Sequence, residues 1–175
     1  MELRSTPKLC SGKTKLNNET RKGRKIMDKN MEEMKARLST LWIFAILNYL
    51  YCDVVGLMDS GLLRQYLTGN VGGIQLTQGF LLSAAILMEI PISMVFLSRI
   101  LKYGANRWAN MIAGGVMTVV QFSTLFFGST PTLYYLFFSV IEITCTALIV
   151  VLAWKWSNPE SSLHSKNLIP QEKLT

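Results

Sequence analysis

The chain has 175 residues, of which 50% are hydrophobic and 17% charged, and its formal net charge is +7. This length suits one domain, and the composition is too apolar for a disordered chain. The apolar residues gather in four stretches of about 20 residues, each long enough for a helix to cross roughly 30 Å of hydrocarbon. We therefore predict a multi-pass membrane protein and exclude a soluble nucleic-acid-binding protein.

Residues 1–37 carry 11 of the 18 Lys and Arg residues and contain no apolar run. We expect this segment to be disordered and cytoplasmic, with no removable signal peptide before the first span. Its charges either serve only to orient the chain or also attract anionic lipid headgroups. Met27, Met31 and Met34 leave open a later start of translation.

The predicted spans form a domain at residues 38–156 and lie at residues 38–58, 80–97, 108–127 and 133–154. Residues 59–79 read as a short amphipathic helix on the bilayer surface, followed by a glycine-rich loop. A tight turn is expected at residues 128–132, and a flexible cytoplasmic tail at residues 157–175. Because His164 in that tail has no companion ligands, we expect no metal site, and no motif indicates a cofactor.

The distribution of basic residues predicts the orientation of the spans. Lys and Arg number 11 before the first span, then one, three and none in the successive connections, and three after the last span. Cytoplasmic segments retain positive charge, so both termini and the connection between the second and third spans are expected inside. The even number of spans agrees with this alternation. We predict an all-α integral membrane four-helix bundle with both termini in the cytoplasm.

Three carboxylates, Asp53, Glu89 and Glu142, fall inside the first, second and fourth spans. A charged side chain at the bilayer centre costs about 2.5 to 3.5 kcal/mol, so each such position is a candidate functional site. Helix rise places Glu89 and Glu142 at one depth, with Asp53 nearer the outer side. No span contains Lys or Arg. We expect at least one carboxyl to be protonated at neutral pH or compensated by an external cation.

Helical spacing predicts that these carboxylates lie on polar faces that meet inside the bundle. Tyr49, Ser93 and Gln121 are the expected hydrogen-bond partners. The predicted faces follow three- and four-residue steps, through Gln75, Gln78, Leu82, Ala85, Glu89 and Ser93 in the second span, Asn110, Gly114, Met117, Gln121 and Thr124 in the third, and Tyr135, Ser139, Glu142, Thr146 and Ile149 in the fourth.

Several functions fit this pattern. The carboxyls could hydrogen-bond between helices and do no more, bind or move a proton or a small cationic or polar solute, or line a quinone or lipid pocket. A transport path would require a homodimer, because four short helices enclose little volume. Alternatively, the chain is a non-transporting membrane module that binds another membrane protein or lipid. A membrane enzyme is disfavoured, since no nucleophile with a base or metal cluster is present.

Five blocks carry a resemblance to a known family, in the order LSTLWIFAILNYLYCDVVGLMD, GGIQLTQGFLL, MEIPISMVFLSR, LKYGANRWAN and PTLYYLFFSVIEI. Together they resemble small bacterial membrane proteins with four predicted spans, classed as a domain of unknown function. The resemblance covers residues 38–156 and implies a multi-pass protein of the bacterial inner membrane. It implies no activity. A fainter similarity, in span number alone, is to DoxX-like membrane proteins.

Overall fold

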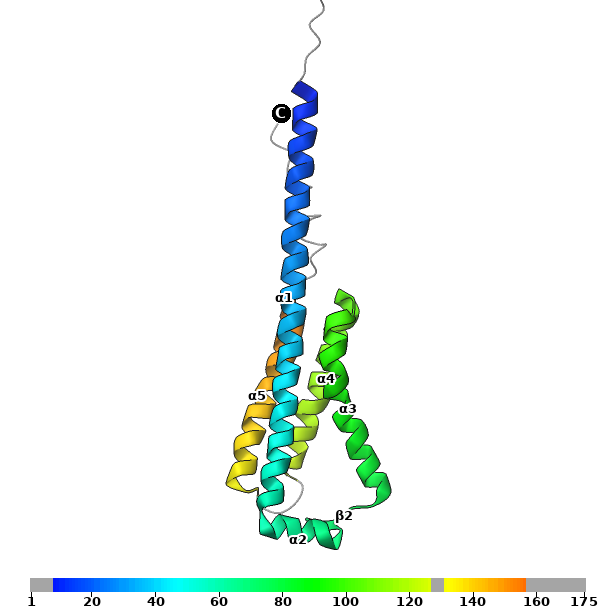
Figure 1. Ribbon diagram of the computed structural model, residues 1–175, viewed down its shortest axis with the longest axis vertical. Helices are drawn as coiled ribbons and strands as arrows, with labels where there is room; N and C mark the ends of the chain where they lie inside the picture. Colours follow the sequence, from blue (N-terminus) through cyan, green and yellow to red (C-terminus); the bar gives the residue numbers. More distant parts are fainter. Residues whose placement is uncertain (1–7, 127–130, 157–175) are drawn as a thin grey trace, which may run out of the picture. The chain divides into compact units, whose positions relative to one another are not determined.

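The structure is a computed structural model that describes residues 8–126 and 131–156, with the backbone alone at residues 8–17 and 19. The described residues form the helices α1 (Lys8–Met58), α2 (Ser60–Thr68), α3 (Gln78–Ile100), α4 (Tyr103–Thr124) and α5 (Leu133–Lys155) (Figure 1). A two-stranded hairpin, β1 (Asn70–Val71) and β2 (Ile74–Gln75), follows α2. The fold is therefore all-helical apart from this hairpin, as predicted. The expected turn at residues 128–132 lies largely, and the tail at residues 157–175 wholly, outside the described residues.

The chain divides into two units, residues 1–34 with 159–175, and residues 35–158. In the first unit the structure is helical from Lys8, where the sequence predicts disorder up to residue 37. The reason is local, because Lys, Glu, Met and Arg dominate residues 20–37 and all favour helix. Lys29 Nζ also lies 3.8 Å from Glu33 Oε1 one turn later, in the spacing that stabilises isolated helices.

The core of the second unit is built mainly by α4 and α5. The predicted polar faces of these two helices are largely the faces that are buried. Asn110, Gly114, Met117 and Gln121 are buried in α4, although Thr124 at its end is exposed. Along α5 the buried face contains Ser139, Glu142, Cys145, Thr146, Ile149 and Ala153. The spacing thus identified the correct inward faces in both helices.

Direct hydrogen bonds join α4 to α5 along their length. Gln121 Nε2 donates to Ser139 Oγ at 3.0 Å, and Thr118 Oγ1 donates to Thr146 Oγ1 at 2.9 Å. Near their connected ends, Tyr135 Oη donates to Thr124 Oγ1 at 2.6 Å. At the opposite ends, Tyr103 Oη donates to the carbonyl of Trp156 at 2.6 Å, and the two rings meet edge to face. Polar contacts therefore fix the register of this pair.

The helix α3 is buried along less of its length than α4 and α5 are. The buried residues of α3 are Pro91, Met94 and Ser98, all in its C-terminal half, whereas Gln78–Glu89 is almost wholly exposed. Glu89 lies two residues before Pro91, or about 200° round the helix at 100° per residue. The predicted polar face of the second span therefore differs from the buried face. Ser98 sets the rotation of α3 about its own axis, because its Oγ donates to Asn110 Oδ1 of α4 at 3.2 Å.

The amphipathic helix predicted after the first span is present as α2. Asp59 caps it, with Oδ1 accepting from the backbone amides of Gly61 and Leu62 at 2.8 and 3.3 Å. The helix ends at Gly69, which adopts a left-handed conformation at φ 71°. In the hairpin, Asn70 pairs with Gln75 and Val71 with Ile74. As Figure 1 shows, α2 crosses from the end of α1 toward the start of α3.

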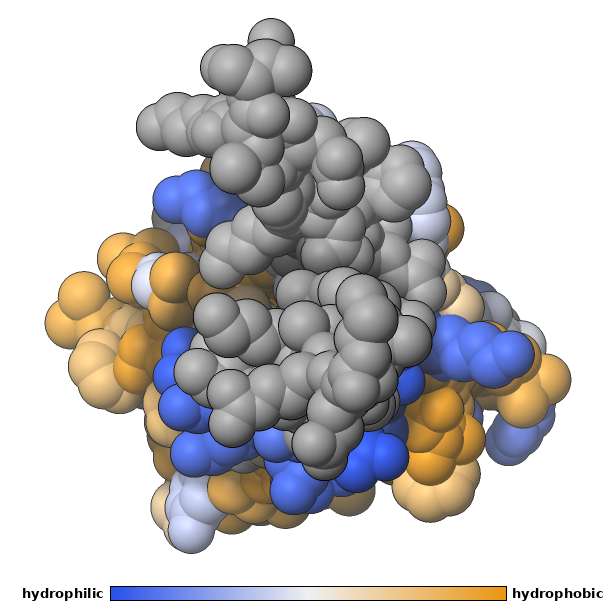
Figure 2. All heavy atoms as spheres, turned by 90° about the horizontal axis from the view of Figure 1, so that it is seen from above, coloured by the Kyte–Doolittle hydropathy of each residue, from blue (hydrophilic) through white to orange (hydrophobic). Residues whose placement is uncertain are grey.

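The second unit carries its apolar side chains on the outside. In Figure 2, hydrophobic residues make up most of the left rim and share the right rim with hydrophilic residues. Three helical segments are long and apolar enough to cross a membrane, Thr20–Met58, Gln78–Ile100 and Leu133–Lys155. The third predicted span, which corresponds to α4, does not meet that criterion, because Asn106, Arg107, Asn110 and Gln121 lower its mean hydropathy. Four spans were predicted, and three are supported by length and composition.

Gly114 provides a test of the packing between α4 and α5. A Cβ atom at this position would lie 2.8 Å from Val150 Cγ2 and 3.3 Å from the Thr146 carbonyl oxygen. We expect Gly114→Ala to lower the free energy of unfolding by about 1 to 3 kcal/mol, as overpacked cores do. Thermal unfolding in detergent measures this effect.

Gly115→Ala is the matched control, because a Cβ atom there would meet no atom within 4 Å. Its unfolding temperature should equal or exceed that of the wild type, since alanine favours helix over glycine. Equal losses in both variants would contradict the close approach at Gly114.

Candidate functional site

Two buried oxygens without hydrogen-bond partners mark the candidate site. Glu142 on α5 is 1% exposed, and its Oε1 is buried without a partner in the described part of the chain. Tyr49 on α1 is 6% exposed, and its hydroxyl is likewise buried and unpartnered there. Buried polar groups are nearly always hydrogen-bonded, so two exceptions together require an explanation. Both residues were predicted as site residues from the sequence.

Electrostatic proximity connects these residues to Asp53. Glu142 lies close enough to Tyr49 and to Asp53 to interact electrostatically with each. Asp53 follows Tyr49 by one helical turn and is exposed. The buried thiol of Cys52 lies near both carboxyl groups. The structure therefore brings Tyr49, Asp53 and Glu142 into one region, with Glu142 inside and Asp53 at the surface.

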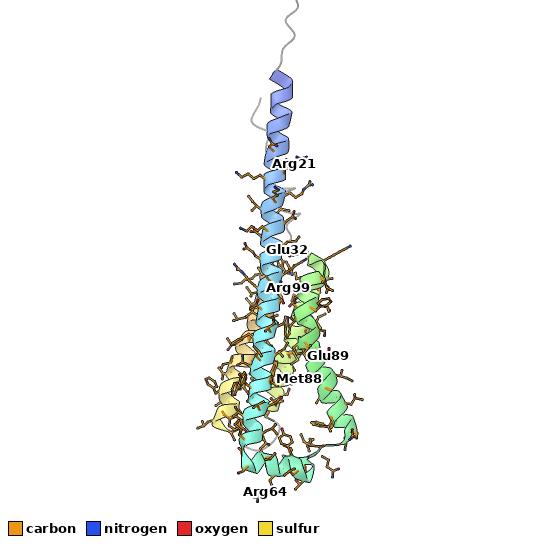
Figure 3. The ribbon with its side chains drawn as sticks, viewed as in Figure 1. Arg21, Glu32, Arg64, Met88, Glu89 and Arg99 are labelled. Carbon is orange, nitrogen blue, oxygen red and sulfur yellow. The ribbon has the colours of Figure 1, made fainter. Side chains whose placement is uncertain are left out.

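Glu89 occupies a different environment. It lies on the exposed part of α3 (Figure 3), and the electrostatic neighbours of Glu142 do not include it. The expected interior pair of Glu89 and Glu142 is therefore not seen. Ser93 is half-buried, and its hydroxyl donates to the carbonyls of Glu89 and Ile90 in its own helix. Because the buried face of α3 is rotated away from Glu89, neither residue joins the group around Glu142.

Gln121 is buried but engaged elsewhere. Its amide donates to Ser139 Oγ, one turn of α5 before Glu142. It therefore packs next to the candidate site and stabilises the α4–α5 contact, without a described hydrogen bond to either carboxyl group.

A second buried polar group joins three helices and was not expected from the sequence. Trp42 Nε1 of α1 donates to Asn110 Oδ1 of α4 at 2.8 Å, and Ser98 Oγ of α3 donates to the same atom. Asn110 Nδ2 donates to Asn106 Oδ1 at 2.6 Å, and Asn106 Nδ2 donates to the Ser98 carbonyl at 2.6 Å. The signal for this network was the pair of asparagines one turn apart in an apolar helix, because buried amides require partners.

The two buried polar groups differ in chemistry. In the asparagine network the side-chain donors and acceptors are matched, which suits a structural role. Around Glu142, a carboxyl oxygen and a phenolic oxygen are both available. Divalent cations such as Ca²⁺ take six to eight oxygen ligands, more than these side chains supply. The described residues contain no group of three or more His, Cys, Asp or Glu side chains that could hold a metal ion. Within the described part of the chain, the group around Glu142 therefore has unused hydrogen-bonding capacity, which the asparagine network does not have.

Comparison with known families identifies the family of the chain. The model of DUF6326, a family of unknown function, matches residues 24–162. The chain belongs to this family. Membership of DUF6326 agrees with the resemblance drawn from the five sequence blocks, and it assigns no activity. Comparison with curated proteins and with solved structures finds no match.

The asparagine network predicts a large effect for one substitution. Asn110→Leu leaves the Trp42 indole N–H and the Ser98 hydroxyl without their shared acceptor. We expect a loss of about 1 to 3 kcal/mol in the free energy of unfolding, the usual cost of an unsatisfied buried polar group. Thermal unfolding in detergent, followed by tryptophan fluorescence, measures the change.

Ser93→Ala is the control, because the Ser93 hydroxyl bonds only carbonyls of its own helix in the described contacts. Its unfolding free energy should change by no more than about 0.5 kcal/mol. If Asn110→Leu proved as stable as Ser93→Ala, the network would not hold α1, α3 and α4 together.

Proposed function

We propose that the chain is an integral membrane protein in which α1, α3, α4 and α5 all cross the bilayer. The support is an inverted distribution of side chains in residues 35–158. Asn106, Asn110, Ser139 and Glu142 are almost fully buried, while large apolar side chains are exposed on every long helix. In water this arrangement would expose a very large apolar surface, whereas in a bilayer that surface faces lipid.

The exposed face of α4 is the reason for counting α4 among the helices that cross the bilayer. Trp108, Ile112, Val119 and Phe122 are each more than half exposed, and they lie on the side opposite the buried asparagines. A helix whose polar side chains are satisfied internally presents only apolar groups to its surroundings. Low mean hydropathy therefore does not argue against a crossing when the polar groups face other helices. With four crossings, the alternation of basic residues places both termini in the cytoplasm, and the family resemblance favours the bacterial inner membrane.

Cysteine labelling tests the crossing of α4. Single cysteines replace Ser60, Lys102 and Thr132 in a variant whose three native cysteines are changed to alanine. A membrane-impermeant maleimide applied to intact cells should label Ser60→Cys and Thr132→Cys, and should label Lys102→Cys only after the membrane is opened. Labelling of Ser60→Cys without Thr132→Cys would show that α4 stays on one side of the membrane.

We further propose that Glu142, with Tyr49 beside it, binds a proton or a small singly charged cation within the bundle. The observation that carries this proposal is the buried, unpartnered Oε1 of Glu142, together with the buried, unpartnered hydroxyl of Tyr49 within electrostatic range of it. A carboxyl group in hydrocarbon with no Lys or Arg near it is stabilised when it takes up a proton or a cation. Asp53, one turn from Tyr49, provides a second, exposed carboxyl within electrostatic range of Glu142.

A second function, that of a membrane module without transport, has one observation in its favour. The Trp42–Asn110–Asn106–Ser98 network fully uses its buried side-chain groups, as expected of polar residues that only hold helices together. In that case the basic segment before residue 38 or the loops would bind another membrane protein or lipid. A transport path, in contrast, would require a homodimer, since one bundle encloses little volume.

Proteoliposomes containing a pH-sensitive dye test the role of Glu142. We expect Glu142→Gln to lower proton or potassium flux at least about tenfold, because charge-assisted contacts contribute about 1.5 to 3 kcal/mol each. Glu89→Gln is the matched control, as it neutralises an exposed carboxyl in another span. Its flux should equal that of the wild type.

The outcomes separate the two functions. Equal fluxes in wild type, Glu142→Gln and empty liposomes would leave the non-transporting module as the better account. Loss of flux in Glu89→Gln alone would move the site to α3. Size-exclusion chromatography of each variant shows whether a lost flux reflects lost assembly.

A further inference from the structure

A pocket lies beside α2, at the adjoining ends of α4 and α5. Its volume is about 390 Å³, and residues from α2, the hairpin, the end of α4 and the start of α5 line it. Thr124 ends α4, and Pro131 and Thr132 precede α5, so the pocket sits where these helices end and not in the middle of the bundle. A volume of this size falls in the range of small-molecule sites.

Three tyrosine side chains line this pocket, Tyr66 from α2 and Tyr134 and Tyr135 from α5. Tyr66 is close enough to Tyr134 and Tyr135, and to Asp53, to interact electrostatically with each, so the phenol groups form a cluster. Tyr135 is held in place, since its hydroxyl donates to Thr124 Oγ1 at 2.6 Å. The cluster therefore brings three tyrosine side chains to the lining of one pocket.

The charge of the lining is negative. Asp59 is its sole charged residue. Because Oδ1 of Asp59 accepts two backbone amides at the start of α2, the carboxylate is fixed in position. The basic residue of α2, Arg64, points away from the other helices (Figure 3) and does not line the pocket. A carboxylate and aromatic side chains in the lining of one pocket can both attract a cation.

We propose that this pocket binds an organic cation that bears a trialkylammonium group. Such a group is compact, poorly hydrated and apolar on its outside, so it gains both from the faces of aromatic rings and from a nearby carboxylate. Leu62, Val71 and Ile74 in the lining match its alkyl surface. The group could belong to a free solute or to a lipid headgroup, since both carry the same chemistry.

This inference goes beyond the proposed role of Glu142, which does not line the pocket. The pocket could bind its ligand even if the buried carboxyl were inert. Glu142→Gln should therefore leave binding in the pocket unchanged, so failure of either proposal can be recognised separately.

Calorimetric titration of the full chain in phosphatidylglycerol nanodiscs tests the proposal. Choline should bind at least about tenfold more tightly than 3,3-dimethyl-1-butanol, its uncharged analogue of the same shape, if cation–π attraction and the carboxylate both act. Equal affinity for the two, or no choline binding, would overturn the proposal. This comparison uses the wild-type chain and does not depend on the folding of any variant.

Substitutions at Tyr66 and Asp59 test which side chains contact the ligand. Tyr66→Leu should weaken choline binding about tenfold, whereas Tyr66→Phe keeps the ring and should retain it. Asp59→Asn should also weaken binding, although asparagine still caps α2. Leu67→Ala is the control, because Leu67 is 80% exposed on the same helix and does not line the pocket. Unchanged affinity in both Tyr66→Leu and Asp59→Asn would overturn the assignment.

Nanodiscs of phosphatidylcholine distinguish the two sources of the cation. Competition by this lipid with free choline would support the pocket as a headgroup site. Undiminished choline affinity in phosphatidylcholine would support a free solute as the ligand.

Discussion

The carboxamide of Asn110 is the contact on which the arrangement of α1, α3 and α4 depends. Its oxygen accepts from Trp42 and Ser98, and its nitrogen donates to Asn106. The bonds from Trp42 and Ser98 join α1 and α3 to α4 and restrain their rotation about their axes, whereas the bond to Asn106 lies within α4. The rotation of α3 in turn decides that Pro91, Met94 and Ser98 face inward. One buried amide is thus shared by three helices and favours the faces that they turn toward each other.

The contact between α4 and α5 depends on a small residue, Gly114, whereas the asparagine network depends on polar side chains. Gly114 lets the backbone of α5 approach at Thr146, and the threonine pair of Thr118 and Thr146 bonds within the space so created. A close approach of this kind strengthens dispersion and hydrogen bonds together. It also holds Glu142, one turn before Thr146, inside the bundle. The position of the candidate site therefore follows from a glycine on the neighbouring helix.

Much of the fold could be predicted from the sequence, because its signals are periodic. The lengths of the apolar stretches predicted the long helices, and the polar steps through Asn110 and Gln121 and through Ser139 and Glu142 predicted the buried faces of α4 and α5. The same reasoning placed Glu89 inward, and the structure has it exposed. The polar face of a helix is buried only if a neighbouring helix covers it. In α3 the hydrogen bond from Ser98 to Asn110 turns a different face toward α4, so the face with Glu89 stays exposed. The tyrosine pocket could not be predicted, since its lining comes from segments about 65 residues apart along the chain, a separation that helical spacing does not encode.

The polarity of α4 bears on how the protein is made. A helix with two asparagines and a glutamine enters hydrocarbon at a cost when it leaves the ribosome alone. Ser98 of α3 has already been synthesised when Asn110 emerges, but Ser139 and Thr146 follow only with α5. An α4 that crosses the bilayer would gain its remaining partners when α5 arrives. Biosynthesis would then favour insertion of the two helices as a hairpin, with the translocon holding α4 until its partner is translated.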